Sequence, residues 1–62
     1  MSNTFQVKTV VCERQVADAH TAALWFSTFL AADKGVPNEV QQVGDDWFVV
    51  DDEGKAARFV SQ

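Results

Sequence analysis

Cysteine is almost absent from this 62-residue chain, in which Cys12 is the only copy. A single cysteine excludes an intramolecular disulfide and a thiolate cluster for zinc, because both need more than one thiol. We therefore expect a reducing, cytoplasmic environment. The polar start, Met1-Ser2-Asn3-Thr4, has no basic segment leading into an apolar run, so no export signal is expected.

Basic residues and glycines are also few. Nine acidic residues against five basic ones give a net charge of −4. The basic residues are scattered, whereas direct nucleic-acid binding needs a clustered basic patch. The three glycines form no phosphate-binding motif, so no cofactor is expected. The longest nearly apolar stretch, residues 22–32, is shorter than the ~20 residues that cross a bilayer, so we expect no membrane partner.

Large apolar residues are well represented. Five phenylalanines, two tryptophans and an apolar fraction of 47% argue against intrinsic disorder. The chain shows no repeat and no linker, which predicts one domain over residues 1–62. A domain of this size buries only about 60% of the surface of its unfolded chain, so marginal stability is expected.

The first predicted element is a strand over residues 5–11, where apolar residues alternate with period two. This pattern places Phe5, Val7, Thr9 and Val11 toward the core. Val10 and Cys12 then point the other way.

A helix is predicted from about Ala17 to Lys34. Asp18 is a suitable N-cap, and Gly35 followed by Pro37 forms a stop signal. An earlier turn within residues 13–16 remains an alternative start. At 100° per residue one face of the helix carries the residues expected to pack on a sheet, which are Ala19, Ala22, Ala23, Phe26, Phe29 and Leu30. Leu24 lies almost opposite this face, and Trp25 lies on its flank.

The remaining residues predict three strands. Residues 39–43 alternate only weakly, and Gly44-Asp45-Asp46 turns the chain into a buried strand over residues 47–50. The turn over residues 51–55 suits a type I turn followed by a left-handed Gly54. Counting back from this turn pairs Val50 with Ala56. The same register places four apolar residues toward the helix, namely Trp47, Val49, Ala57 and Phe59.

These elements predict an α+β fold in the order β-α-β-β-β, with one amphipathic helix packed on a small, mainly antiparallel sheet. In this arrangement the second face of the hairpin has no cover. It carries Phe48, Val50, Ala56, Arg58 and Val60.

Catalysis and metal binding find little support in the sequence. Cys12 and His20 form the only candidate pair of a nucleophile and a general base. No third group is placed by the sequence to orient the imidazole. We expect Cys12 to be a small residue at a strand end and His20 to point to solvent, so no enzyme is predicted. The acidic runs around residues 47–50 lack calcium-loop spacing, since four apolar residues stand where ligands are needed.

Two kinds of residue predict contact with another protein. The acidic turns would present charge to a basic groove, and the apolar residues with Arg58 have the composition of interface centres. Acidic turns also serve solubility, and the helix could be rolled to bury its tryptophan. The candidate partner-binding residues are Asp45, Asp46, Asp51, Asp52, Glu53, Phe48, Val50, Arg58, Leu24 and Trp25.

The predicted function is a non-catalytic protein-binding module. Its most concrete form is a small acidic inhibitor or modulator that docks on a basic partner, such as a nucleic-acid-binding protein. In size and charge the chain is similar to small accessory or inhibitor proteins, many of which are encoded by phages and mobile elements. The alternative is an accessory protein that forms a homodimer through an exposed sheet face or through its helix.

Overall fold

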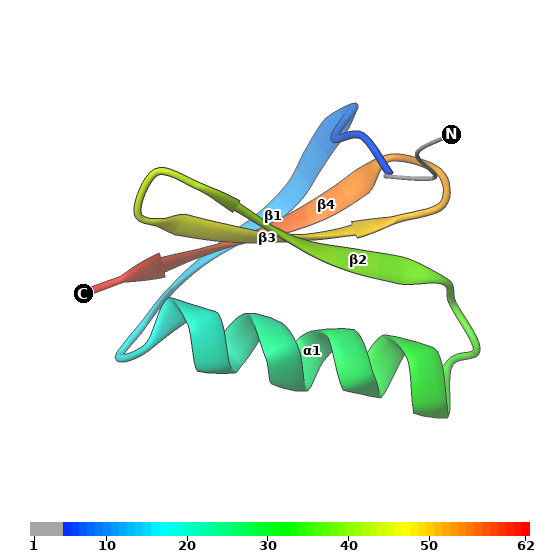
Figure 1. Cartoon of the computed structure of the whole chain (residues 1–62), viewed down its shortest axis with the longest axis horizontal. Coiled ribbons are helices and arrows are strands. Elements are labelled where there is room, and N and C mark those ends of the chain that lie inside the picture. Colours follow the sequence, from blue (N-terminus) through cyan, green and yellow to red (C-terminus); the bar gives the residue numbers. More distant parts are fainter. Residues whose placement is uncertain (1–4) are drawn as a thin grey trace.

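The computed structural model describes residues 5–62, which form one helix and a four-stranded sheet (Figure 1). The elements are β1 (Thr9–Val16), α1 (Ala19–Asp33), β2 (Asn38–Val43), β3 (Asp46–Asp51) and β4 (Lys55–Ser61). The predicted α+β fold and its element order are confirmed. Residues 1–4, from which no export signal was expected, lie outside the described residues.

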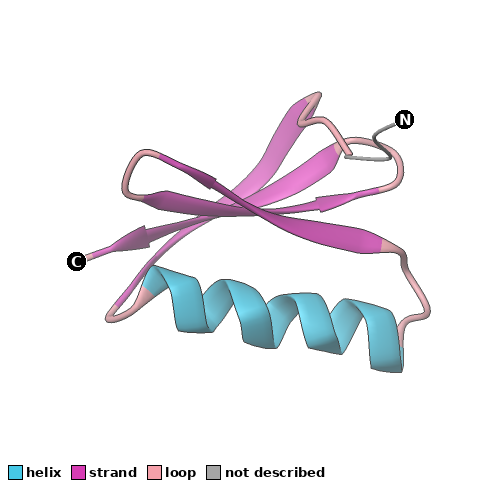
Figure 2. Cartoon of the chain, viewed as in Figure 1, coloured by secondary structure: helices cyan, strands magenta, loops and turns pink. Residues whose placement is uncertain are grey.

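The sheet has the strand order β1-β4-β3-β2, and α1 runs along one of its faces (Figure 2). β3 pairs antiparallel with both β2 and β4, whereas β1 pairs parallel with β4. β4 and β3 are therefore the central strands. The edges are β1 and β2, which α1 connects in the chain. Among residues 5–62, no helix is long and apolar enough to span a membrane.

The β3–β4 hairpin has the predicted register. Val50 pairs with Ala56 and Trp47 with Phe59. Gly54 has a φ of 83°, in the left-handed region that glycine adopts without a steric penalty. The Asp51 carboxylate accepts the backbone N–H groups of Glu53 at 2.8 Å and Lys55 at 2.9 Å, which closes the turn.

The core lies between α1 and the central strands. Its buried residues are Ala19, Ala23, Val49, Ala57 and Phe59. The alanines sit in the first turns of α1 and let the helix approach the sheet closely, as their small size predicts. Burying a side chain such as Phe59 contributes roughly 1.5–3 kcal/mol. Trp47 packs against this core but is only half-buried.

The helix begins and ends close to the predicted residues. The Asp18 carboxylate accepts the Thr21 hydroxyl at 3.0 Å and the His20 N–H at 3.1 Å, as an N-cap does. These bonds, with that of the Thr21 hydroxyl foremost, lower the pKa of Asp18. At the other end Gly35 has a φ of 65°, and the Val36 N–H donates to the Leu30 carbonyl at 2.9 Å.

The prediction that Phe29 faces the core is wrong. Ala19, Ala23, Phe26 and Leu30 form the contact line, and Phe29 lies beside this line and is 43% exposed. Its ring packs on Phe26 with centroids 6.5 Å apart, and the Lys34 ammonium lies 5.7 Å from its centre. The periodic pattern could not separate a residue at the rim of the apolar face from one at its centre.

The predicted first strand is also wrong in its bounds and its facing. The strand is β1, and residues 5–8 precede it as an irregular segment. Val7, Thr9 and Val11, which were expected in the core, are exposed. Cys12 is not a strand-end residue, because it lies within β1 and pairs with the core residue Ala57.

A β-bulge explains the reversed facing. The register between β1 and β4 shifts between Val10 and Cys12, so Val11 has no partner of its own. A bulge inserts one residue into the alternation and moves the following residues to the opposite face. Cys12 therefore lies on the helix side, where it lines a groove with Phe26 and Leu30.

The sheet face opposite α1 is covered in part by the segment at residues 5–8. The Phe5 N–H donates to Glu39 at 3.1 Å, and the Gln41 amide donates to the Phe5 carbonyl. The Gly54 carbonyl accepts the Lys8 N–H at 2.8 Å and the Thr9 N–H at 3.1 Å. The prediction that this face lacks cover is therefore wrong.

Candidate functional site

Cys12 and His20 occupy different surroundings. Cys12 lies in β1 on the groove lined by Phe26 and Leu30. His20 is exposed, as expected, and its ring stacks on Trp47 with centroids 4.0 Å apart and an interplanar angle of 14°. In the described part of the chain, no hydrogen bond joins the Cys12 thiol or the His20 ring to a third group, as a catalytic set would require. Within residues 5–62, no three His, Cys, Asp or Glu side chains gather closely enough to hold a metal ion.

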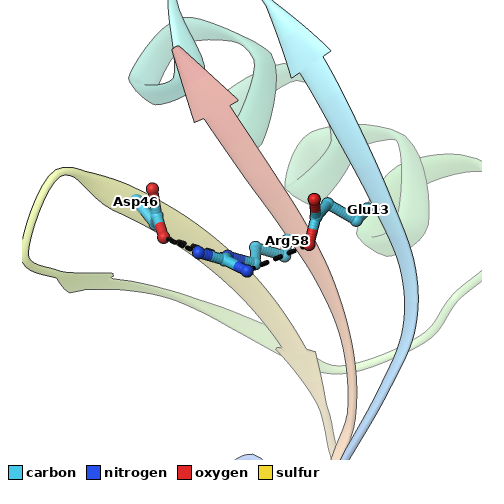
Figure 3. Close-up of polar contacts among 3 residues, drawn as sticks. All are labelled: Glu13, Asp46 and Arg58. Atoms are coloured by element: carbon cyan, nitrogen blue, oxygen red, sulfur yellow. Dashed lines mark hydrogen bonds and ion pairs between the residues drawn. The ribbon is translucent and has the colours of Figure 1, made fainter.

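Arg58 joins three strands on the face opposite α1 (Figure 3). Its Nε–H donates to the Asp46 carboxylate at 2.9 Å, and its Nη2 group donates to the same oxygen. Its Nη1 group donates to Glu13 at 3.0 Å. The hydrogen bonds to Asp46 are the main cause of a raised Arg58 pKa. Two predicted partner-binding residues, Arg58 and Asp46, are thus engaged within the chain.

The other acidic candidates divide into structural and exposed residues. Asp51 holds the β3–β4 turn through two backbone N–H groups. Glu53 pairs with Lys55 at 3.4 Å, an exposed ion pair that contributes little stability. Asp45 and Asp52 are exposed on separate hairpin turns, which lie at opposite ends of the sheet. The acidic turns therefore do not form one continuous charged surface.

The apolar candidates on the hairpin are largely covered. Val50 is fully buried, and Phe48 is half-buried. Val60 is half-buried as well. Val50 cannot contact a partner without unfolding of the hairpin, so the structure does not place it on a binding surface.

The outward side of α1 is the main exposed apolar surface of the described residues. Trp25 is 74% exposed and Leu24 is 47% exposed, so the predicted outward placement of both is confirmed. With Thr21 and Thr28 they line an open groove of about 240 Å³. These four residues stand at positions i, i+3, i+4 and i+7, the diamond that receives one side chain of a facing helix in knobs-into-holes packing. We call them the α1 groove.

The α1 groove carries no charged residue, and its two hydroxyl groups are bonded within the helix. From Ala19 to Ala32 the sequence has no Asp, Glu, Lys or Arg, whereas a surface helix normally carries charged residues on its outer side. The Thr28 hydroxyl donates to the Leu24 carbonyl and the Thr21 hydroxyl to Asp18, both at 3.0 Å. Because both hydroxyls are bonded within the helix, an apolar group can enter the groove without stranding a hydroxyl donor.

β1 forms a second exposed apolar region. α1 packs on β2, β3 and β4 and scarcely reaches β1. Val11 is 59% exposed, and Val10, which pairs with Ala56 on the sheet face opposite α1, is 47% exposed. Sequence reasoning missed this region, because it took Val11 as a core residue. The polar run Glu13-Arg14-Gln15, with two charged residues, is the signal that could have identified an exposed edge strand.

Comparison with protein-family models, with curated proteins and with solved structures found no match to this chain.

Proposed function

We propose that this protein is a non-catalytic protein-binding module that docks through the α1 groove. The observation that carries this proposal is the exposure of Trp25 on a helix side without a charged residue. A contiguous apolar patch on a small protein marks an interaction site more often than a scattered apolar residue does. Tryptophan is also enriched among the residues that dominate binding energy.

The shape of the α1 groove favours a helical partner. It is lined by the two small residues Thr21 and Thr28 and by the two large residues Leu24 and Trp25. A large apolar side chain of a facing helix would fill this diamond while Trp25 packs along the helix flank. We propose a cytoplasmic setting, which agrees with the single exposed thiol of Cys12.

A second candidate function is the acidic inhibitor that docks on a basic partner. The observation that favours it is the exposure of Asp45 and Asp52 in a chain of net charge −4. Since Asp46, Asp51 and Glu53 are engaged within the chain, only part of the acidic window is free to steer a partner. The acidic turns would then add to association rate, while the α1 groove supplies affinity.

Affinity capture from the native host tests the main proposal. The immobilised protein is compared with Trp25→Glu and with a matched control, Val11→Glu, which introduces the same charge at an exposed apolar residue of β1. The captured protein is then purified and its dissociation constant measured with each variant. We expect Trp25→Glu to weaken binding at least about tenfold and Val11→Glu to leave it unchanged. Equal binding by the native protein and Trp25→Glu would reject the α1 groove.

The same purified partner tests the acidic candidate. Replacing Asp45 and Asp52 by asparagine removes two exposed charges and keeps residues that suit turns. If charge steers the partner, association slows and loses part of its dependence on ionic strength. An association rate identical to that of the native protein would show that the acidic turns do not steer the partner and serve solubility alone.

A further inference from the structure

We infer that the outer edge of β2 joins two copies of this chain, whose β2 strands pair antiparallel and unite the two sheets. This edge is a different surface from the α1 groove, so the inference goes beyond the proposed function. Three features of the described residues support it: outward backbone groups of β2 that no other strand meets, a regular strand without the devices that protect β1, and a two-fold register that opposes no like charges directly.

β2 directs one row of backbone groups away from the sheet. In an antiparallel pair, every second residue directs its N–H and C=O to the neighbouring strand, and the residues between direct theirs away. Val43 and Asp46 flank the two-residue turn Gly44-Asp45 and pair with each other, which makes them a hydrogen-bonded pair of the ladder. Counting back from Val43, the residues that direct N–H and C=O to the outer edge are Asn38, Val40 and Gln42.

The outer edge of β2 has no strand beside it among residues 5–62. β2 lies at the end of the sheet and pairs with β3 alone (Figure 1). Turn and loop backbone bonds do not reach residues 38–43, and the bonds to Phe5 and Ser27 use side chains of β2. An extended strand presents N–H and C=O groups at the spacing that satisfies such an edge. The chemistry of the edge therefore selects another β-strand.

The two edges of the sheet differ in their protection. β1 has a bulge at Val11 and carries Glu13 and Arg14, and bulges and charges keep an edge strand from pairing with another chain. β2 pairs with β3 without a register shift, contains no proline or basic residue, and has Glu39 as its one charge. Pairing of β2 with β2 uses the open edge of both copies and leaves only the protected β1 edges. The assembly therefore closes at two copies instead of growing into a fibre.

A two-fold axis at Val40 uses every outward group of β2. Val40 then opposes Val40 of the second copy, and Asn38 opposes Gln42, so each outward N–H meets a C=O. Paired residues lie on the same face of a sheet, so both α1 helices cover the same side of the joined sheet. Val40 packs against the core beneath α1, and its pairing joins the two cores at their margins.

Glu39 limits the register without preventing the contact. With the axis at Val40, Glu39 opposes the Gln41 amide of the second copy, and the two Glu39 carboxylates are diagonal neighbours. A register shifted to place Glu39 against Glu39 opposes like charges directly, which destabilises a strand pair. The charge of Glu39 therefore favours the register in which all outward groups are used.

The other charges near this edge lie in the β2–β3 turn, on β3 and at the end of α1. Asp46 and Asp51, on β3, hold Arg58 and the β3–β4 turn of their own chain. Asp45, in the β2–β3 turn, lies level with residue 35 of the second copy, where Asp33 and Lys34 carry opposite charges that offset each other. A modest repulsion between two chains of net charge −4 remains. Raising the salt concentration should therefore strengthen the dimer slightly.

Pairing of two short edge strands buries little surface. It falls below the ~1,200 Å² at the lower end of stable interfaces, so we expect a reversible dimer with a dissociation constant on the order of 100 µM. Sedimentation equilibrium up to about 500 µM protein measures this dimer, since mass action populates a weak complex at high concentration. A native protein that stays monomeric over this range would overturn the inference.

Amide hydrogen exchange of the native protein locates the contact. Exchange of the N–H groups of Val40 and Gln42 is compared by NMR at about 20 and 500 µM protein. Since exchange proceeds from the remaining monomer, we expect both rates to fall about threefold at the higher concentration. Exchange rates in β1 should not change. Slowing confined to β1 or to α1 would place the contact elsewhere and overturn the pairing through β2.

A proline on the edge tests the backbone contact. Gln42→Pro removes an N–H that points away from β3, and proline is tolerated on edge strands at such positions. We expect this variant to remain monomeric at about 500 µM. Gln42→Ala is the matched control, because it shortens the same side chain but keeps the N–H, and it should weaken the dimer no more than about twofold. Equal dimerisation by the two variants would overturn the inference.

Circular dichroism of both variants separates loss of dimer from loss of fold. If Gln42→Pro does not fold, hydrogen exchange of the native protein decides between the outcomes, because it needs no substitution.

Disulfide trapping tests the register. In a Cys12→Ser background, the variants Glu39→Cys and Gln41→Cys are oxidised separately and as a mixture. Because residue 39 opposes residue 41 of the second copy, the mixture should form a cross-link between the two variants in clear excess over cross-links within either one. Predominant self-cross-linking of Glu39→Cys or of Gln41→Cys would overturn this register.

The inference and the proposed function fail separately. Trp25→Glu removes the aromatic wall of the α1 groove and should still dimerise through β2. Loss of the dimer in Trp25→Glu with retention in Gln42→Pro would move the contact to α1 and overturn the inference. If a protein captured from the host is lost with Gln42→Pro while the native chain alone stays monomeric, the edge binds a foreign strand and the second copy is rejected.

Discussion

The two neighbours of β4 differ in how they are held. β3 reaches β4 through a turn of a few residues and pairs antiparallel, whereas β1 reaches it from the far end of the chain and pairs parallel. The β3–β4 pair contains the fully buried Val50 and Ala56. Seven of the eight residues of β1 are exposed. A short turn specifies the partner and the register of β3, while the place of β1 depends on the finished sheet.

The same difference separates the two strands that carry the buried core from the strand that is mostly exposed. Val49, Ala57 and Phe59 pack against α1 and form the core on β3 and β4. β1 contributes backbone hydrogen bonds and the Glu13 contact to Arg58 but few buried side chains. Substitutions should therefore be costly on β3 and β4 and mild on β1.

Phe59→Ala should give the largest effect. Phe59 is 4% exposed and packs on Phe26 with centroids 5.7 Å apart, so its truncation leaves a cavity between helix and sheet. We expect a loss of about 3–5 kcal/mol, enough to unfold so small a domain. Thermal unfolding followed by circular dichroism measures this loss.

Val11→Ala is the matched control on β1. Val11 is 59% exposed, and surface substitutions of this kind usually change the free energy of unfolding by less than about 0.5 kcal/mol. A loss from Val11→Ala comparable to that from Phe59→Ala would contradict the division between a stabilising hairpin and an exposed edge strand.

Gly54→Ala should give an intermediate loss of stability. Gly54 lies in the β3–β4 turn, and its carbonyl also accepts the N–H groups of Lys8 and Thr9, where β1 begins. Its φ of 83° disfavours a side chain, and an added Cβ would lie 2.6 Å from the Lys8 side chain. We expect a loss of about 1–3 kcal/mol in chemical denaturation. Combining Gly54→Ala with Lys8→Ala shortens the side chain that would clash, so it should recover part of the loss. No recovery would assign the effect to backbone strain and to the Cβ of residue 8, which alanine retains and which lies 2.9 Å from the added Cβ.

Acidification should give the smallest loss of stability. It acts on Asp18, the N-cap of α1, which lies where the chain leaves β1 and enters the helix. The folded state lowers the pKa of Asp18 below its ordinary value of 3.8, so the ionised carboxylate stabilises the fold above that pH. This contribution is lost as the pH falls through the lowered pKa. Denaturation at several pH values should show a shallower acid loss for Asp18→Asn than for the native protein. Identical pH profiles would show that the ionisation of Asp18 contributes nothing to folding.

Prediction from sequence succeeded where the determining residues are close together in the chain. Asp18 with Thr21 marks the helix start, and Gly54 specifies the β3–β4 register through its turn. Prediction failed for β1, because the bulge at Val11 depends on the fit of β1 to β4 and leaves no local signature. The cover over Val50 was missed for the same reason, since Phe5 is held by the distant Glu39 and Gln41.

Part of the candidate site could have been derived from the predicted register. Phe48 opposes Arg58, and Asp46 lies two residues before Phe48 on the same face of β3. Diagonal neighbours on one face are within reach of a long side chain, so the Arg58–Asp46 ion pair follows from the pairing. Helical periodicity placed Leu24 opposite the packed face and Trp25 on its flank, but it left open a roll of the helix that would bury the tryptophan, which the structure shows to be 74% exposed. Their partner does not follow from periodicity, because the outer side of a helix does not identify what covers it.

The central position of β4 has a consequence for the order of events during synthesis. A ribosome makes β4 last of the five elements, yet β1 and β3 both pair with it. β1 therefore waits for residues 55–61 before it has any strand to join, whereas α1 and the β2–β3 hairpin can form earlier from local contacts. The sheet can close only after β4 has left the ribosome. A premature stop before Lys55 would remove the common partner of β1 and β3 and leave a helix beside a two-stranded hairpin, which is marginally stable at best.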